Sequence, residues 1–240
     1  MQRLAKAGFQ LNKMTRHLQL NSARQEIKSA RIRHAKMLDD IRLHCIQNNA
    51  TKDQFLFLLA IPVIYAAWEG YFRLACSICL RRQCHVGKKA KKYTGKYAAL
   101  WLQKEGFFDS FLQSLFNAMQ FGRTSNKINA GKYLAVSEFS AKMNDWLDAP
   151  ISHLTNFDEL VTTYSNVNKE VASLNCGIIG LDITNVDFSK LNELLNRRNE
   201  IAHGGLLDYP RENTVTDLLD YTSALIDSFH ASVEAWLVNS

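Results

Sequence analysis

Proline and glycine are scarce in this chain, which has 3 prolines and 11 glycines among 240 residues. Sandwiches and barrels need frequent turns, and turns are rich in these two residues, so their scarcity argues against a fold of many short strands. Runs of β-branched residues are also few, whereas stretches rich in alanine, leucine, lysine and glutamate are long. We therefore expect an all-α fold.

The N-terminus lacks the continuous apolar segment of a secretory signal, because basic and polar residues interrupt MQRLAKAGFQLNKMTRHLQL throughout. The cysteines number 5, an odd count that does not fit a framework of paired disulfides. Free thiols are typical of a reducing compartment. We therefore expect a cytoplasmic protein.

Acidic residues are rare in the first half of the chain. Residues 1–132 contain 23 Lys and Arg against 7 Asp and Glu, whereas residues 133–240 contain 6 against 16. Such asymmetry is typical of a surface that binds a polyanion such as RNA. The alternative is that the two halves attract each other within one bundle.

The most basic segment, RRQCHVGKKAKKYTGKY at residues 81–97, has seven basic side chains and no acid. Tyr93 and Tyr97 lie among its lysines, and aromatic rings in such a setting can stack on the bases of a single strand. The alternative is a solvated loop that only aids solubility. We expect these side chains to contact RNA: Arg81, Arg82, Lys88, Lys89, Lys91, Lys92 and Lys96.

Apolar spacing predicts three long helices. A polar helix covers about residues 13–48, an apolar helix follows it, and a helix with one apolar stripe covers about residues 214–238. Between the last two we expect short helices and a second basic loop at residues 122–132. No linker or repeat divides the chain, so we expect a single helical domain over residues 1–240, with residues 1–14 flexible or peripheral.

The second helix, FLFLLAIPVIYAAWEGYFRLACSICLRR at residues 55–82, is apolar nearly all round and therefore has to be buried in protein or in lipid. Residues 55–72 approach the length of a bilayer span. Pro62 and Glu69 argue against a span, and the central helix of a bundle, kinked at Pro62, fits better. We expect no membrane contact.

RRNEIAHGG at residues 197–205 stands where the last short helix should end, because Gly204 and Gly205 can adopt the left-handed conformation that stops a helix. One interpretation is an ordinary helix terminus. In that case the arginines face solvent, and the helix dipole stabilises His203 as a cation.

A second interpretation is a site for phosphoryl transfer within RNA. A histidine that titrates near neutrality can take the proton of a ribose 2′-hydroxyl, or protonate the leaving 5′-oxygen, without a metal. The guanidinium of arginine can hold the scissile phosphate and stabilise the transition state. Five residues turn a helix by about 140°, so Arg198 and His203 do not share a stripe. Side chains of two subunits would have to converge across a two-fold axis.

The segment RNEIAH at residues 198–203 resembles the signature of the HEPN superfamily, in which an arginine, a polar residue and a short spacer precede a histidine. YAAWEGYF at residues 65–72 and VNKEVASLNCGIIGLDI at residues 167–183 resemble its toxin and defence branch. The resemblance implies a helical bundle, a homodimer with a composite site, and a metal-independent endoribonuclease without a cofactor. It also implies that Arg198, His203 and Asn199 form the site. The first two would be catalytic and Asn199 a polar helper.

One feature departs from the toxins of that superfamily that are paired with a nucleotidyltransferase antitoxin. In them a tyrosine stands two residues after the histidine. Here that position is Gly205, and Tyr209 lies farther on. The departure argues against control of this protein by a nucleotidyltransferase antitoxin.

Glu69 stands in an apolar helix, where an unpaired carboxylate would be costly. Arg73, one turn later, can pair with it. Alternatively, Glu69 is a supporting residue that orients Arg198 or His203 across the bundle.

Cys76, Cys79, Cys84 and His85 offer four ligands of the kind that zinc prefers. A second Cys-x-x-Cys pair is missing, however, and the first pair lies in an apolar helix. We expect core cysteines and no metal.

Together these patterns predict a HEPN-type endoribonuclease that leaves a 2′,3′-cyclic phosphate and a 5′-hydroxyl. The resemblance alone implies its role as a toxin or antiviral effector, with an antitoxin or defence-system protein as partner. Two alternatives stay open: a non-catalytic HEPN-fold module that binds RNA or protein, and an antitoxin or regulatory subunit that acts by helix packing.

Overall fold

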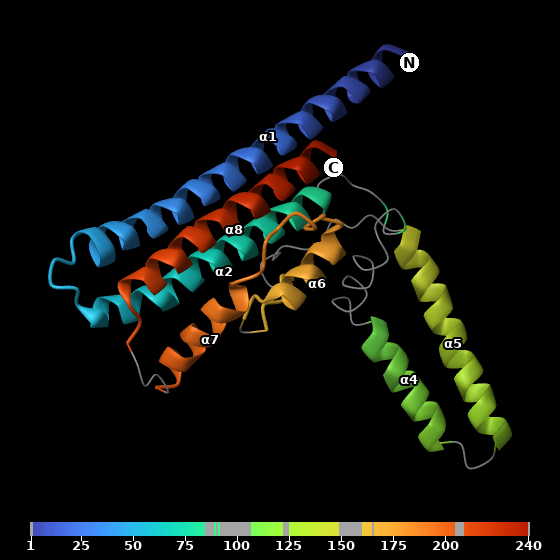
Figure 1. Cartoon of the computed structure of the whole chain (residues 1–240). Helices are drawn as coiled ribbons and strands as arrows, with labels where there is room; N and C mark the ends of the chain where they lie inside the picture. The colour runs from blue at the N-terminus through green and yellow to red at the C-terminus, as the bar shows by residue number, and fades with distance from the viewer. Residues whose placement is uncertain are drawn as a thin grey trace. The chain divides into compact units, whose positions relative to one another are not determined.

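The computed structural model describes residues 2–84, 89, 91, 107–121, 125–148, 160–164, 166–204 and 209–239. Its elements are α1 (Gln2–Ile41), α2 (Gln54–Cys84), α4 (Phe107–Phe121), α5 (Ser125–Asp148), α6 (Lys169–Ile179), α7 (Leu191–Ala202) and α8 (Glu212–Asn239) (Figure 1). A short π-helix, Arg42–Gln47, follows α1. The prediction of an all-α fold is confirmed for the described residues.

Contacts between residues divide the chain into two compact units. Unit 1 comprises Met1–His85 and Asn156–Ser240, and unit 2 comprises Val86–Thr155. Unit 2 is therefore inserted between α2 and α6 of unit 1. The sequence predicted one domain over residues 1–240, and whether the two units act as one domain stays a prediction.

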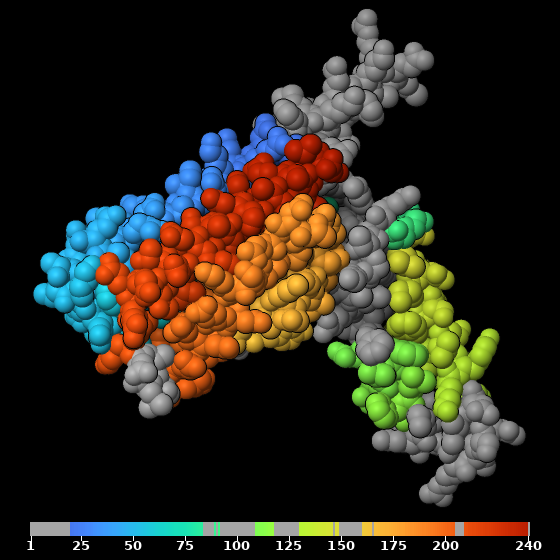
Figure 2. Space-filling view, viewed as in Figure 1, coloured from blue at the N-terminus to red at the C-terminus, as the bar shows by residue number. Residues whose placement is uncertain are grey.

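α2 is the central helix of unit 1 and packs against α1, α6, α7 and α8. Its Trp68, Tyr71 and Phe72 are 0% exposed and meet Phe229 of α8, with ring centroids between 5.3 and 6.2 Å apart. On the face shown in Figure 2, the side chains of α6, α7 and α8 cover most of α2. The aromatic core thus forms between α2 and α8.

The apolar character of α2 follows from this central place. Within the described residues, Gln54–Gln83 is long and apolar enough to cross a membrane by length and composition alone. Half of its most apolar window is buried inside the protein, and the core helix of a bundle passes the same test. Pro62 lies within α2, where the sequence predicted it.

The N-terminal segment is helical, and whether it is peripheral stays a prediction. α1 begins at Gln2, so it includes residues that were predicted to be flexible or peripheral. Residues 2–13 contain one glycine and no proline, and their Ala, Leu, Gln, Lys and Arg residues are good helix formers. Nothing in this segment therefore stops the helix.

Unit 2 contains α4 and α5, which pack against each other through Phe111 and Phe139, with ring centroids 4.5 Å apart. The basic loop predicted at residues 122–132 is wrong from Ser125 onwards, because α5 begins there and continues to Asp148. Lysine and alanine favour a helix, and Gly131 costs only about 1 kcal/mol within one.

The two ends of α6 are fixed locally, and the segment that follows α6 leads to α7, which carries the sequence motif. The Asn168 side chain caps α6 by accepting the N–H of Val171 at 2.9 Å. Gly180 ends α6 with a φ of 77°, in the left-handed region that glycine tolerates. After the connection, α7 packs against α2.

Candidate functional site

The two adjacent arginines of the motif face different ways on α7. Arg197 hydrogen-bonds Glu193, one turn earlier on the surface, at 3.0 Å. Arg198 follows buried Leu194 and Leu195 by four and three residues, so it lies on the side of α7 that faces the bundle. Arg198 is half-buried there.

The guanidinium of Arg198 is held by three neighbours. Its Nη1 donates to Oδ1 of Asn199 at 2.8 Å and to Oδ1 of Asn166 at 3.3 Å. Its Cζ lies 5.4 Å from the centroid of the Tyr65 ring, within the range of a cation–π contact. Both hydrogen bonds use Nη1, so within the described part of the chain the N–H groups of Nε and Nη2 stay available to a ligand.

Tyr65 connects this guanidinium to the core of unit 1. Its hydroxyl accepts the backbone N–H of Val167 at 2.6 Å, and the Glu69 carboxylate is near enough to raise its pKa. The indole N–H of Trp68 donates to the carbonyl of the same Val167 at 3.1 Å. Burial raises the pKa of Tyr65, and the charge of Glu69 raises it further, whereas the N–H of Val167 and the charge of Arg198 lower it. Tyr65 therefore stays neutral.

Glu69 lies next to this cluster. Ion pairs within the described residues do not include the predicted pair of Glu69 with Arg73, whereas the Glu69 charge raises the pKa of Tyr65. The supporting role of Glu69 towards Arg198 or His203 stays a prediction.

His203 is the exposed residue that ends α7. Its backbone N–H still donates to the carbonyl of Asn199 at 3.0 Å, whereas Gly204 turns the chain away with a φ of 67°. The helix end predicted at Gly204 is therefore confirmed. Among the described contacts, the imidazole of His203 does not reach Arg198, as the helical spacing predicted.

The basic side chains predicted to bind RNA have different surroundings. Arg82 is 3% exposed, so its place on an RNA-binding surface is corrected: the side chain is buried, because the end of α2 is still part of the core. Arg81 is partly exposed and forms an ion pair with Glu26 of α1. The other members of the predicted set belong to unit 2 and are Lys88, Lys89, Lys91, Lys92 and Lys96.

Two of these lysines are described, and both meet one acid. Lys89 and Lys91 place their Nζ atoms 3.4 and 2.5 Å from Oδ1 of Asp148, at the end of α5. The lysines lower the pKa of Asp148, first through the hydrogen bond from Lys91. Lys88, Lys92 and Lys96 lie outside the described residues.

Two cysteines of the predicted core, Cys76 and Cys79, are buried on α2, and Cys176 of α6 is buried with them. Burial raises the pKa of the Cys76 and Cys79 thiols, with the neighbouring Cys176 adding to the effect. Protonated thiols of this kind are poor nucleophiles and poor metal ligands. Within the described residues no three His, Cys, Asp or Glu side chains form a metal-binding group.

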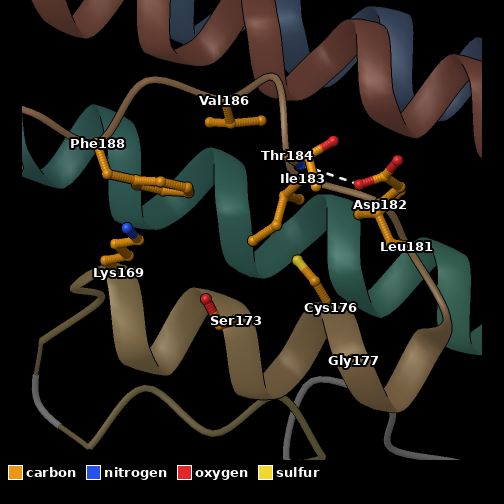
Figure 3. Close-up of a pocket in the computed structure, with 10 residues that line it drawn as sticks. All are labelled: Lys169, Ser173, Cys176, Gly177, Leu181, Asp182, Ile183, Thr184, Val186 and Phe188. Atoms are coloured by element: carbon orange, nitrogen blue, oxygen red, sulfur yellow. Dashed lines mark hydrogen bonds between the residues drawn. The ribbon is translucent and has the colours of Figure 1, made fainter.

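A cavity of about 430 Å³ lies between α6 and the segment that follows it. In Figure 3, Val186, Phe188 and Ile183 of that segment point towards α6, from which Lys169 and Ser173 face them. Neither Arg198 nor His203 lines this cavity. The sequence did not predict it.

Sequence reasoning also missed Tyr65 and Asn166 as neighbours of Arg198, and Val167 as the partner of Tyr65. An aromatic residue in an apolar helix, such as Tyr65, usually indicates core. Asn166 carries no sequence signal, because a lone asparagine before a helix reads as part of a turn.

A family model described as RiboL-PSP-HEPN matches residues 20–235 of the chain. The match covers both units described above, including α2, the connection before α6 and the whole of α7. Neither the curated proteins nor the solved structures contain a significant match.

Proposed function

Because the chain belongs to the RiboL-PSP-HEPN family, we propose that it is a metal-independent endoribonuclease whose catalytic residues are Arg198 and His203. Membership of a HEPN family indicates a nuclease or an RNA-related function. The proposals of endoribonuclease activity and of the two catalytic residues rest on the chemistry of α7 and of its surroundings.

One observation carries the proposal: the geometry of the Arg198 guanidinium. Asn166 and Asn199 hold Nη1, while among the residues that the structure describes the Nε and Nη2 edge keeps its donors for a ligand. This edge matches two oxygens of a phosphate, which arginine binds with two parallel hydrogen bonds. A purely structural arginine would be expected to use this edge within the protein.

The proposed reaction needs only proton transfer and charge stabilisation. A histidine takes the proton of the ribose 2′-hydroxyl, the 2′-oxygen attacks phosphorus, the bond from phosphorus to the 5′-oxygen breaks, and that oxygen receives a proton. Arg198 stabilises the charge on the pentacoordinate phosphorus. The products are a 2′,3′-cyclic phosphate and a 5′-hydroxyl, so DNA is not cut.

A homodimer would complete the site, since His203 lies apart from Arg198 in one chain. α2 carries an exposed apolar stripe for such contact: Phe55, Leu59 and Val63 are 53%, 47% and 38% exposed and recur every four residues. The next residue in this spacing, Ala67, is 0% exposed, so the exposed stripe ends at Val63. In the proposed dimer this stripe packs on its own copy and the two motifs share one axis, so that one His203 serves as base and the other as acid.

The biological role as a toxin or antiviral effector is part of the proposal and rests on the resemblance of the motif. A partner that neutralises or triggers the nuclease, such as an antitoxin or defence-system protein, belongs to the same role. Expression of the chain in a bacterial host should arrest growth, and His203→Ala should relieve the arrest. Growth arrest that persists in His203→Ala would contradict the role.

The direct test is cleavage of a mixed-sequence RNA by the purified chain in EDTA. Arg198→Ala should lower the rate by about 10² to 10³ and His203→Ala by about 10² to 10⁴. Arg197→Ala is the matched control, because Arg197 is the neighbouring arginine on the surface and should be dispensable. End analysis should show 2′,3′-cyclic phosphates, and a fully 2′-deoxy substrate should survive.

Cutting that persists in both Arg198→Ala and His203→Ala would contradict the proposed site. Intact RNA with the wild-type dimer would favour the non-catalytic alternative. Binding of the same RNA would then be measured to separate an RNA-binding module from a subunit that acts by helix packing.

A further inference from the structure

We propose that Asn166 is a positioning residue for Arg198 and that Tyr65 fixes the segment that carries Asn166. This inference rests on the proposed function, because it concerns how the phosphate-binding guanidinium is held. Asn166 itself need not touch the RNA. The segment in question is the connection before α6, residues 162–168, of which residue 165 is not described.

The beginning of this connection is fixed by a buried amide. Asn175 of α6 is 3% exposed, and its side chain pairs with both backbone groups of Thr162, at 3.1 Å to the N–H and 2.8 Å to the carbonyl. The same amide also donates to the carbonyl of Val171 at 2.8 Å. An asparagine that satisfies three backbone groups ties the connection to α6.

The end of the connection is fixed by α2. Val167 is 0% exposed, and both of its backbone groups bind side chains of α2, the N–H to Tyr65 and the carbonyl to Trp68. The next residue, Asn168, caps α6. Between the two ends, the N–H of Asn166 closes a turn by donating to the carbonyl of Thr163 at 2.8 Å.

Asn166 and Asn199 differ in what they can do for Arg198. Asn199 is the next residue on the same helix, so its contact moves with α7 and cannot orient the guanidinium towards the rest of the bundle. Asn166 is 32 residues away and belongs to the connection that α2 and α6 hold. Its hydrogen bond therefore fixes the guanidinium relative to the core of unit 1.

Tyr65 contributes twice to this arrangement. Its ring lies beneath the guanidinium, and its hydroxyl binds the backbone one residue after Asn166. Loss of the hydroxyl would leave the ring in place but release Val167. The structure thus separates two effects of Tyr65, of which Tyr65→Phe removes only the second.

The test is a double-mutant cycle in RNA cleavage. Asn166→Ala should lower kcat by about ten- to a hundredfold with little change in KM, because the guanidinium acts in the transition state. In an Arg198→Ala background the same change should have no further effect, because Asn166 acts only through Arg198. Asn192→Ala, an exposed asparagine on α7, is the control and should cut at the wild-type rate.

Tyr65→Phe serves as the second variant. It should lower kcat in the wild-type background and leave Arg198→Ala unchanged, while the chain remains folded by circular dichroism. Non-additivity of both variants with Arg198→Ala supports the inference. Equal losses in the presence and absence of Arg198, or no loss from Asn166→Ala in an active nuclease, would overturn it.

The two proposals fail differently. If the wild-type chain does not cleave RNA, the proposed function fails, and the positioning role that rests on it fails as well. If the wild type cleaves, loses activity in Arg198→Ala, and is indifferent to Asn166→Ala, only the positioning role fails.

Discussion

The buried hydroxyl of Tyr65 should be worth a measurable part of the stability of unit 1. Tyr65 is 1% exposed, and its hydroxyl is the acceptor for the N–H of Val167, which is 0% exposed. Tyr65→Phe keeps the ring and removes only this acceptor. A buried N–H that loses its partner costs about 1 to 3 kcal/mol. The nearby Glu69 carboxylate adds little, because it is partly exposed and water can solvate it in place of the phenol.

Tyr71→Phe is the matched control for this estimate. Tyr71 is equally buried in α2, but its hydroxyl meets Nδ1 of His230 at 2.8 Å, and His230 is only half-buried. Water can therefore take over the partner, and the expected cost is about 0.5 to 1.5 kcal/mol.

Urea unfolding followed by tryptophan fluorescence measures both variants. Trp68 lies in the core beside Val167 and should report the transition. At about 2 to 4 °C per kcal/mol, Tyr65→Phe should also lower the Tm by several degrees. A loss for Tyr65→Phe no larger than that for Tyr71→Phe would refute the claim that Val167 depends on the hydroxyl.

Three further predictions concern pH, assembly and RNA binding. Burial lowers the pKa of His230 below its ordinary 6.5, so the unfolded chain binds more protons. Stability should therefore fall as the pH drops below about 6.5 and through the folded pKa, and less so in His230→Gln, as thermal unfolding at each pH would show. Leu59→Glu should shift the proposed dimer to monomer in analytical ultracentrifugation. The Tm of the monomer should stay unchanged, since this side chain is 47% exposed. A dimer that persists would place the interface elsewhere. Asp148→Asn should release Lys89 and Lys91 and tighten RNA binding, with a salt slope steeper by up to about 0.7 per lysine; unchanged binding in a salt titration would remove these lysines from the RNA surface.

The spacing of apolar residues and the glycines that end helices predicted the parts of the fold that depend on neighbours in sequence. The apolar stripe of α8, the apolar character of α2, and the helix end at Gly204 each follow from residues within one or two turns. The wrong prediction of a loop from Ser125 onwards has a local cause as well, because basic residues do not by themselves indicate a loop and lysine favours a helix.

The surroundings of Arg198 could not be predicted in the same way. Tyr65, Asn166 and Arg198 come from three separate segments, and their contact depends on how α2, the connection before α6 and α7 pack. Arg82 was misplaced for a related reason, since a charged residue at a helix end usually lies on the surface. No pattern within one segment indicates such contacts.

At Gly204 the left-handed backbone conformation, and not the space for a side chain, limits which residue can replace glycine. Within the part of the chain that the structure describes, a Cβ on this residue would meet no other atom within 4 Å, yet its φ of 67° is one that L-residues rarely adopt. An L-alanine would therefore be disfavoured by roughly 1 to 2 kcal/mol through its backbone alone. A D-alanine, introduced by chemical ligation, would adopt this φ without the backbone strain, because the steric rule is reversed for D-residues. The direction in which the chain leaves His203 is thus set by stereochemistry.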